Sequence, residues 1–462
     1  RTMAAASART TGATTRTGPG RRRRTSATAT SPGLARSATT TTKMMMMKKK
    51  KNGRTTASAS KRPTIETRLV HLAGKLEDPF DSVAPPLYQT ATFNQPGATD
   101  FGAYDYSRSG NPTRTLLENQ MADIENADGA FAFASGMAAI ATVMRLVKPG
   151  ECVLAGNDIY GGTQRFLGKI APAKQGLTVK HVDMTQVEEV KAALEEGTKG
   201  NGQPPVKLVL IESPTNPRLE VCDISAICKV AKEYGAVVCV DNSIMAPIFQ
   251  RPIDLGADIS MTSATKFIAG HSDVTGGILS VVGKELCEEI YFHQNAEGNM
   301  MSPFECWLSL RGLKTMALRM EKQAQNAEKI AIFLAGHPLV KKVNYAGLPG
   351  HPNSGIHASQ ASSGGSIISF ETGSVEASRR IVEDTKLFKI TVSFGSVTSL
   401  ISMPCYMSHA SVPAEIRKER GLVDDLVRIS AGIENIDDLI GDLKEAFAGA
   451  EAAVGASSGQ AK

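Results

Sequence analysis

The sequence predicts an α/β fold in which a mainly parallel β-sheet is wrapped by helices and followed by a smaller α+β domain. One observation is that short apolar runs, such as 206–211 and 236–240, alternate with amphipathic segments. Strands this apolar are buried on both faces, as in parallel sheets covered by helices. A second observation is that the pattern changes near 311–319, where a long helical stretch begins. With 462 residues, 42% of them hydrophobic, the chain is long enough for two or three domains.

The elements of the first region follow from apolar runs and their flanking turn residues. Helices are predicted at 137–147 and 224–234, the second ending before Gly235. Two prolines and an asparagine predict a loop at 212–217. The predicted strands are 130–134, 152–155, 206–211, 236–240, 259–262 and 277–282.

The second region has a different order of elements. A long helix is predicted at 316–335, and a last amphipathic helix at 436–447 has four apolar residues on one side. The strands between them are predicted at 366–370, 389–394 and 426–429. This order predicts a separate α+β domain from about residue 313.

The first 62 residues have a composition that does not predict a fold. Residues 1–65 hold 16 of the 52 Lys and Arg and no Asp or Glu, so the rest has 36 basic and 46 acidic residues. Segments rich in Ser, Thr and Arg with few large apolar groups cannot offset their ordering entropy and are typical of organelle transit peptides. The basic runs 21–24 and 48–51 could instead bind nucleic acid, but no aromatic residue accompanies them.

Two further classes are disfavoured by the composition. No apolar run approaches the roughly 20 residues that span a bilayer, so no membrane insertion is expected. The seven cysteines show no C-x-x-C spacing, and several lie in apolar runs. Buried reduced thiols are therefore expected rather than a metal site or a disulfide framework.

The most informative residue is Lys266, which follows two hydroxyl-bearing residues in the stretch 263–267, downstream of Asp241 at a predicted strand end. A lysine amine can form a Schiff base with pyridoxal phosphate, and the hydroxyls of Ser263 and Thr265 can bind the phosphate. A carboxylate can hold the pyridine nitrogen protonated, so that the ring accepts electrons. Asp241 could alternatively cap a helix, because residues of capping type follow it.

Other candidates lie after other predicted strands, where ligands bind in open parallel sheets. Ser135, Gly136 and Met137 open a helix, whose free N–H groups can bind a phosphate, although an ordinary turn would look the same. Tyr160 could stack on a cofactor ring or could be a packing residue. Asn216, in the predicted loop, occupies an equivalent place.

Two arginines and one histidine are left with alternatives. Arg108 suits an anion but could form a surface salt bridge. Arg428 lies in an apolar strand and needs an anion, either a substrate carboxylate or a structural Asp or Glu. His271 is interpreted as a structural hydrogen-bonding residue.

Taken together, these segments resemble the Cys/Met metabolism family of pyridoxal phosphate enzymes. The resemblance runs in order from about residue 64 to 448, and its matching motifs are 106–113, 135–139, 160–163, 212–217, 240–243, 263–273 and 428–434. It implies an aspartate-aminotransferase-like (fold type I) structure, with a mainly parallel seven-stranded sheet domain and a smaller α+β C-terminal domain. It also implies a homotetramer built as a dimer of dimers.

The resemblance also implies roles for individual residues. Lys266 would be the Schiff-base lysine, and Asp241, Tyr160 and Asn216 would contact the ring. Catalysis would involve Lys266, Tyr160 and Tyr106, and no metal is expected. The phosphate would be held by Gly136, Met137, Ser263 and Thr265, and by Tyr106 and Arg108 of a neighbouring subunit. Substrate would be bound by Arg428, Ser393 and Tyr160.

Within the family, the segments 241–247, 291–298, 306–315 and 402–410 resemble the plant plastid branch that cleaves L-cystathionine by α,β-elimination. The resemblance thus implies a carbon–sulfur lyase of methionine biosynthesis in the plastid, which is favoured over the mitochondrion. Enzymes that make cystathionine, or cleave it at the γ-carbon, share the same motifs and remain alternatives, as does a non-catalytic relative. Gly162 replaces the cysteine of methionine γ-lyases, which argues against that activity.

Four regions are expected along the chain. They are a basic transit peptide (1–62), an arm that contacts the neighbouring subunit (63–112), a cofactor-binding domain (113–312) and a C-terminal domain (313–462). The expected partners are a small-molecule substrate and further copies of the chain, with no nucleic acid and no membrane.

Overall fold

The computed structural model describes residues 62–74, 78–199, 202–410 and 412–459, which belong to one compact unit. The predicted transit peptide, apart from Arg62, lies outside the described residues. Among the described helices, none is both long and apolar enough to cross a membrane.

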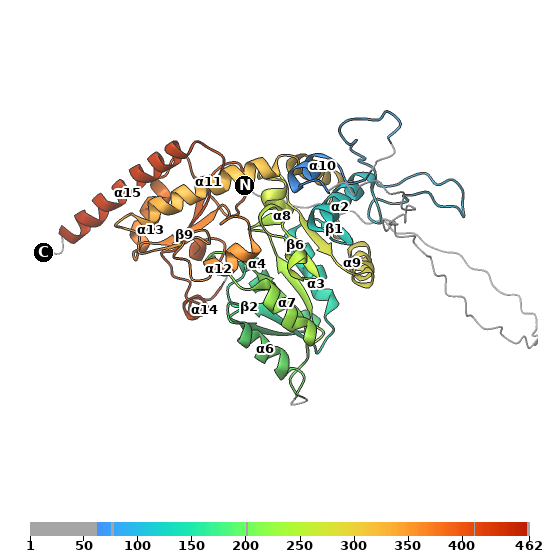
Figure 1. Cartoon of the computed structure of the whole chain (residues 1–462), viewed down its shortest axis with the longest axis horizontal. Coiled ribbons are helices and arrows are strands. Elements are labelled where there is room, and N and C mark those ends of the chain that lie inside the picture. The colour runs from blue at the N-terminus through green and yellow to red at the C-terminus, as the bar shows by residue number, and fades with distance from the viewer. Residues whose placement is uncertain (1–61, 75–77, 200–201, 411, 460–462) are drawn as a thin grey trace, which may run out of the picture. The chain divides into compact units, whose positions relative to one another are not determined.

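The larger sheet has seven strands in the order β1-β7-β6-β5-β4-β2-β3. Three of them, β1, β6 and β2, are labelled in Figure 1. β7 runs antiparallel to both of its neighbours and all other pairs are parallel, so the predicted mainly parallel sheet is confirmed. The strands are β1 (Gly129–Phe133), β2 (Cys152–Gly156), β3 (Thr178–Val182), β4 (Val206–Glu212), β5 (Val237–Asp241), β6 (Ile259–Thr262) and β7 (Gly277–Val281).

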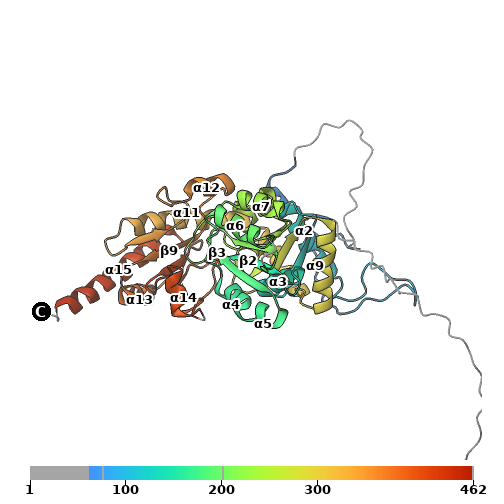
Figure 2. The same cartoon turned by 90° about the horizontal axis from the view of Figure 1, so that it is seen from below.

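Helices cover both faces of this sheet, as its apolar strands require. Two of them, α6 (Val187–Glu196) and α7 (Ile224–Glu233), lie on one face, where their apolar residues pack against β2, β4 and β5. On the other face lie α3 (Gly136–Val143), α4 (Gly161–Lys169) and α5 (Ala171–Gln175) (Figure 2). The remaining elements of this region are α2 (Pro112–Glu125), η1 (Met144–Leu146), α8 (Ala246–Phe249), η2 (Pro252–Leu255), η3 (Ala264–Ile268), α9 (Lys284–Glu297) and α10 (Pro303–Leu313).

The C-terminal region contains a five-stranded sheet with the order β10-β11-β12-β9-β8. Only the β10–β11 pair is parallel, which agrees with the predicted α+β character. The long helix α11 (Met316–Ala335) has the predicted bounds, and its apolar residues share a core with the sheet and with α15 (Ile436–Gly459). The other elements are β8 (Lys342–Asn344), α12 (Ser354–Gln360), β9 (Ile367–Glu371), α13 (Val375–Asp384), β10 (Lys389–Ile390), β11 (Leu400–Ser402), η4 (Pro404–Tyr406), α14 (Ala414–Glu419) and β12 (Val427–Ser430).

The segment before the large sheet is mostly irregular. Apart from α1 (Ile65–Val70), its described residues up to 111 form no helix, and a single bridge joins Thr92 to Tyr106. The segment ends where Asn111 caps α2, accepting hydrogen bonds from two backbone N–H groups of the first turn, with Pro112 at the first helical position.

Two predicted elements differ from the structure for identifiable reasons. The strand predicted at 389–394 stops at Ile390, and beyond it Ser393 and Gly395 both have a φ of +83°, a conformation that a β-strand does not adopt. The helix predicted at 137–147 ends at Val143 and continues as the 3₁₀ turn η1.

Candidate active site

The C-terminal edge of the large sheet carries most of the predicted functional residues. Strands β1, β2, β4, β5 and β6 run in the same direction, so the residues that follow them meet at one edge. A cavity of about 220 Å³ lies there. It is lined by eight of the predicted residues, namely Gly136, Met137, Tyr160, Asn216, Asp241, Ser263, Thr265 and Lys266.

Lys266 enters this cavity from a π-helical turn, η3, that follows β6. The turn is interrupted at Lys266 itself, whose φ of −89° and ψ of −125° are not helical. Its ammonium group donates a hydrogen bond to Ser393 Oγ at 2.5 Å and lies 4.6 Å from the ring centre of Phe394. Burial, followed by the nearby charge of Arg428, lowers the pKa of Lys266 to about 8, against the opposing effect of Asp241.

Asp241 is the last residue of β5 and faces the same cavity. Its Oδ1 accepts a hydrogen bond from the backbone N–H of Ser243 at 3.0 Å. Burial raises the pKa of Asp241, although the Ser243 hydrogen bond and the positive charge of Lys266 oppose that shift. A carboxylate here is therefore stabilised further by a cationic group placed in the cavity.

The start of α3 forms the wall where an anion can bind. Ser135 Oγ caps the helix by accepting from Ala138 N at 3.0 Å, and the first N–H groups of a helix have no partner within it. A Cβ at Gly136 would lie 3.1 Å from Met261 Cε and 3.3 Å from Ser263 Oγ, so a side chain would crowd this wall. Nearby, the Thr265 hydroxyl accepts a hydrogen bond from Gly276 N at 3.0 Å.

Tyr160 precedes α4 and is 40% exposed, so its ring is accessible at the cavity. The Tyr160 backbone N–H donates to Glu212 Oε2 at 2.9 Å. A Cβ at Gly162 would lie 2.4 Å from Tyr160 Cε1, so this position has no space for the cysteine of methionine γ-lyases unless the tyrosine moves.

Arg428, in the middle of β12, contacts the cavity-lining residues Asn216 and Phe394 and is 2% exposed. Its guanidinium donates to Asn216 Oδ1 at 2.7 Å and to the Ser393 carbonyl oxygen at 2.8 Å. Burial lowers the pKa of Arg428 to about 10, while Tyr160 and then Glu212 oppose the shift. No carboxylate within the described residues forms an ion pair with Arg428, so its charge is open to an anionic ligand.

The structure does not bring Tyr106 and Arg108 to this cavity. Tyr106 is 43% exposed, and Arg108 lies with its guanidinium carbon 5.3 Å from the Tyr106 ring centre. Arg108 Nε donates to Asn295 Oδ1 on α9 at 3.3 Å. His271 contacts the carbonyl oxygen of Ala269 through Nδ1 at 2.6 Å, in keeping with the structural interpretation.

Several residues that line the cavity were not singled out from the sequence. Glu212 ends the apolar run of β4. A carboxylate at the end of a buried strand indicates a site residue, and the same pattern indicated Asp241. Phe394 follows a residue with positive φ, and no periodicity marks it. Ser243 donates its backbone N–H to Asp241 and accepts one from Ser263 N at 2.8 Å through its hydroxyl.

Solved structures define the class to which this fold and site belong. The crystal structure of cystathionine γ-lyase from Lactobacillus plantarum complexed with L-serine matches with a TM-score of 0.80 and 38% identity, over 84% of this chain and 100% of that chain. Cystathionine γ-synthase from Xanthomonas oryzae in complex with cystathionine matches with a TM-score of 0.81 and 37% identity, over 85% and 100%. The fold is that of fold type I pyridoxal phosphate enzymes, as predicted.

The chain belongs to the Cys/Met metabolism PLP-dependent enzyme family, whose model matches residues 66–448. A chloroplastic cystathionine β-lyase of Arabidopsis thaliana is 57% identical over 392 residues, which cover 85% of this chain and 82% of that protein. One from Mimosa pudica is 54% identical over 391 residues, covering 85% and 83%. Chloroplastic mimosinase of the same plant is 47% identical over 382 residues, covering 83% and 84%. The predicted family and the pyridoxal phosphate cofactor are thereby confirmed.

The cavity fits this cofactor. The wall at Gly136, which has no side chain and lies at the start of α3, suits a phosphate, and the buried Asp241 carboxyl suits a protonated ring nitrogen. The Lys266 amine lies in the same cavity, where it can reach an aldehyde.

Proposed function

We propose that this protein is a cystathionine β-lyase, which cleaves L-cystathionine to homocysteine, pyruvate and ammonia. The observation that carries the proposal is the Lys266 amine, which shares one cavity with Asp241 and lies near the buried Arg428, a guanidinium that forms no ion pair with a carboxylate of the described residues. The similarity to relatives named cystathionine β-lyase supports the choice of substrate.

Lys266 is proposed to hold the cofactor and then to act as general base on the substrate. When bound, pyridoxal phosphate accepts the electron pair that is left when the α-proton departs. The neutral Lys266 amine takes the α-proton, and the bond between the β-carbon and sulfur then breaks. Lys266 or a tyrosine, either Tyr160 or Tyr106, gives a proton to the leaving sulfur. The remaining three-carbon fragment is hydrolysed to pyruvate and ammonia.

The other residues around the cavity are proposed to bind and orient. Asp241 keeps the ring nitrogen protonated, Tyr160 stacks on the ring and Asn216 contacts its hydroxyl. Arg428 binds the substrate α-carboxylate, and Ser393 lies beside it. The phosphate is held by the N–H groups and hydroxyls of Gly136, Met137, Ser263 and Thr265.

Tyr106 and Arg108 are proposed to reach the phosphate of a neighbouring subunit. Their exposure and their distance from the cavity of their own chain support this assignment. Exposed apolar residues of the same segment, including Phe80, Val83 and Phe101, support its role as an arm that packs on another copy. A homotetramer made of such dimers is proposed.

The regions of the chain are proposed as they were expected from the sequence. Residues 1–62 form a plastid transit peptide, 63–112 the arm, 113–312 the cofactor-binding domain and 313–462 the C-terminal domain. The two separate sheets, on either side of the proposed boundary at 313, support the last two. The chloroplastic relatives support the plastid location.

Product identification tests the proposed reaction. We expect the purified protein with pyridoxal phosphate to convert L-cystathionine to pyruvate and homocysteine, measured by mass spectrometry. 2-Oxobutanoate with cysteine would indicate γ-cleavage instead and would overturn the proposal. A protein that shows no visible cofactor band and no turnover would indicate a non-catalytic relative.

The depressed pKa of Lys266 predicts how cofactor capture depends on pH. Only the neutral amine attacks the aldehyde, and with a pKa of about 8 roughly a tenth of it is neutral at pH 7. The rate of cofactor capture by the cofactor-free protein should therefore rise with pH, reach half of its maximum at about pH 8 and level off above about pH 9. Stopped-flow absorbance measures this rate. A rate that keeps rising through pH 10, as for an ordinary lysine, would contradict the lowered pKa.

A further inference from the structure

We infer that Glu212 is a positioning residue of this active site, holding the backbone of Tyr160 and that of Asn216 with its two carboxyl oxygens. The inference rests on the proposed function, in which both residues contact the cofactor ring. It adds a residue that touches neither cofactor nor substrate in the proposal.

The Glu212 carboxyl group joins two loops through hydrogen bonds to their backbone. Glu212 is the last residue of β4, and its Oε2 accepts from Tyr160 N at 2.9 Å, in the loop after β2. Its Oε1 accepts from Asn216 N at 2.8 Å, in the loop after β4 itself. One carboxyl thus fixes the main chain of two residues that approach the cavity from different strands.

The carboxyl group is buried and has no cationic side chain bonded to it. Glu212 is 8% exposed, and within the described part of the chain its side-chain oxygens bond only to those two N–H groups. A buried carboxyl is costly unless its oxygens are satisfied. Here the two backbone N–H groups are the hydrogen-bond donors to the carboxyl oxygens. The position of the carboxyl group and the positions of both loops therefore depend on each other.

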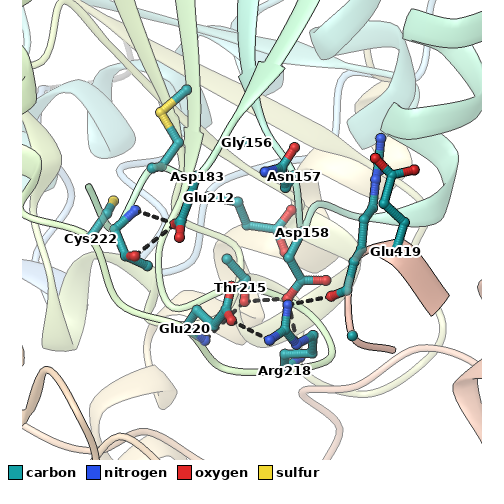
Figure 3. Close-up of a pocket in the computed structure, with 14 residues that line it drawn as sticks. Gly156, Asn157, Asp158, Asp183, Glu212, Thr215, Arg218, Glu220, Cys222 and Glu419 are labelled. Atoms are coloured by element: carbon teal, nitrogen blue, oxygen red, sulfur yellow. Dashed lines mark hydrogen bonds and ion pairs between the residues drawn. The ribbon is translucent and has the colours of Figure 1, made fainter. Parts of the chain in front are cut away.

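Among the described residues, no side chain of the neighbouring loops forms a hydrogen bond with the Glu212 carboxyl group. Glu212 also lines a second cavity of about 300 Å³, shown in Figure 3. The polar side chains there bond mainly to one another. Asp158 Oδ2 accepts from Thr215 Oγ1 at 2.5 Å, and Arg218 pairs with Glu220 at 2.6 Å. Glu212 therefore lies in the wall between the two cavities.

Glu212 is also linked electrostatically to the cofactor site. It is the register partner of Asp241 on the neighbouring strand. Burial, and then the negative charge of Asp241, raise the pKa of Glu212, while the two N–H groups lower it. The two N–H groups thus hold the Glu212 carboxyl next to Asp241, whose own carboxyl is held by the Ser243 N–H.

The test is Glu212→Gln, which keeps the size of the side chain but replaces one acceptor oxygen by an NH2 group. That NH2 group must then face either Tyr160 N–H or Asn216 N–H, donor against donor. We expect kcat to fall about tenfold to a hundredfold, the fold-change for an unsatisfied buried hydrogen-bonding group. The KM for cystathionine should change less than about threefold, because Arg428 is retained. The circular dichroism of the cofactor band should weaken, and cofactor should dissociate about tenfold more readily.

The matched control is Glu220→Gln, in the same loop and second cavity but paired with Arg218 in a partly exposed site. Its kcat, cofactor band and cofactor affinity should stay within about twofold of the wild type. A Glu212→Gln protein that melts like the wild type and keeps native kcat and cofactor dichroism would overturn the inference. If the wild-type protein itself forms no cofactor band, the proposed function fails, independently of Glu212.

A measurement on the wild-type protein covers the case in which Glu212→Gln does not fold. Hydrogen exchange, resolved to single residues, should show the Tyr160 and Asn216 amides protected at least about a hundredfold over exposed loop amides. Exchange of both at the rate of exposed amides would show that Glu212 does not hold them.

Discussion

Lys266→Ala should abolish turnover of cystathionine, with kcat/KM at least about 10⁴-fold below that of the wild type. The amine has two proposed tasks, binding the cofactor and removing the α-proton, and alanine can do neither. The wild-type protein should show a visible absorption band that borohydride reduction removes, and the variant should not form a borohydride-sensitive band. Absorption spectra and a pyruvate assay measure the two effects.

Lys266→Arg separates charge from proton transfer. The guanidinium keeps a positive charge near Asp241 but cannot act as a base near neutral pH, so this variant should be as inactive as alanine. The control is Lys284→Ala on α9, whose side chain is 65% exposed and pairs with Glu288 at 3.3 Å. It should behave like the wild type. Turnover by Lys266→Ala above about a tenth of the wild-type rate would refute the proposed role.

The sequence predicts well the polar residues that come at or shortly after the end of a buried strand. Asp241 and Lys266 follow buried apolar runs, and parallel strands bring such ends to one edge, where the structure has its cavity. The same reasoning applied to β4 points to Glu212. Its contacts join loops from two strands, however, and a single sequence does not give the register that makes them meet.

Other parts of the fold were missed because their sequence signal is weak. Strand β3 carries Lys180 and His181, and none of its residues is fully buried, so it lacks the apolar run that marks the central strands. Its place at the edge of the sheet explains that composition. The break after Ile390 depends on a positive φ at Ser393, a residue type that seldom adopts it, so nothing local predicts the turn toward Lys266.

The roles proposed for Tyr106 and Arg108 could not be derived from periodicity, because they require a second copy of the chain. The segment that carries them is held to its own subunit by Arg114, whose guanidinium donates to the carbonyl oxygens of Ser107, at 2.5 Å, and Arg108, at 3.1 Å. Arg114 is 2% exposed. The backbone of this segment is thus fixed, while the Tyr106 side chain is exposed and Arg108 contacts the Tyr106 ring and Asn295.

Arg428→Lys should raise the KM for cystathionine about 30-fold to 4,000-fold, with a smaller effect on kcat. The planar guanidinium can present two parallel N–H donors to a carboxylate, whereas an ammonium group is a point charge. Loss of one partner of a buried, hydrogen-bonded charge pair costs about 2–5 kcal/mol, and about 1.4 kcal/mol corresponds to tenfold in affinity. Steady-state kinetics with cystathionine measure the change.

The cofactor spectrum distinguishes substrate binding from damage to the site. Arg428 also donates to Asn216 Oδ1 and to the Ser393 carbonyl oxygen, so its replacement could disturb both. If Arg428 acts on the substrate carboxylate, the variant should keep the visible cofactor band while its KM rises. Arg251→Lys, at a partly exposed ion pair with Asp254, serves as the control and should leave both unchanged. An unchanged KM in Arg428→Lys would mean that the carboxylate binds elsewhere. A lysine ammonium cannot present the two parallel N–H donors of a guanidinium, so a carboxylate bound there would lose measurable affinity.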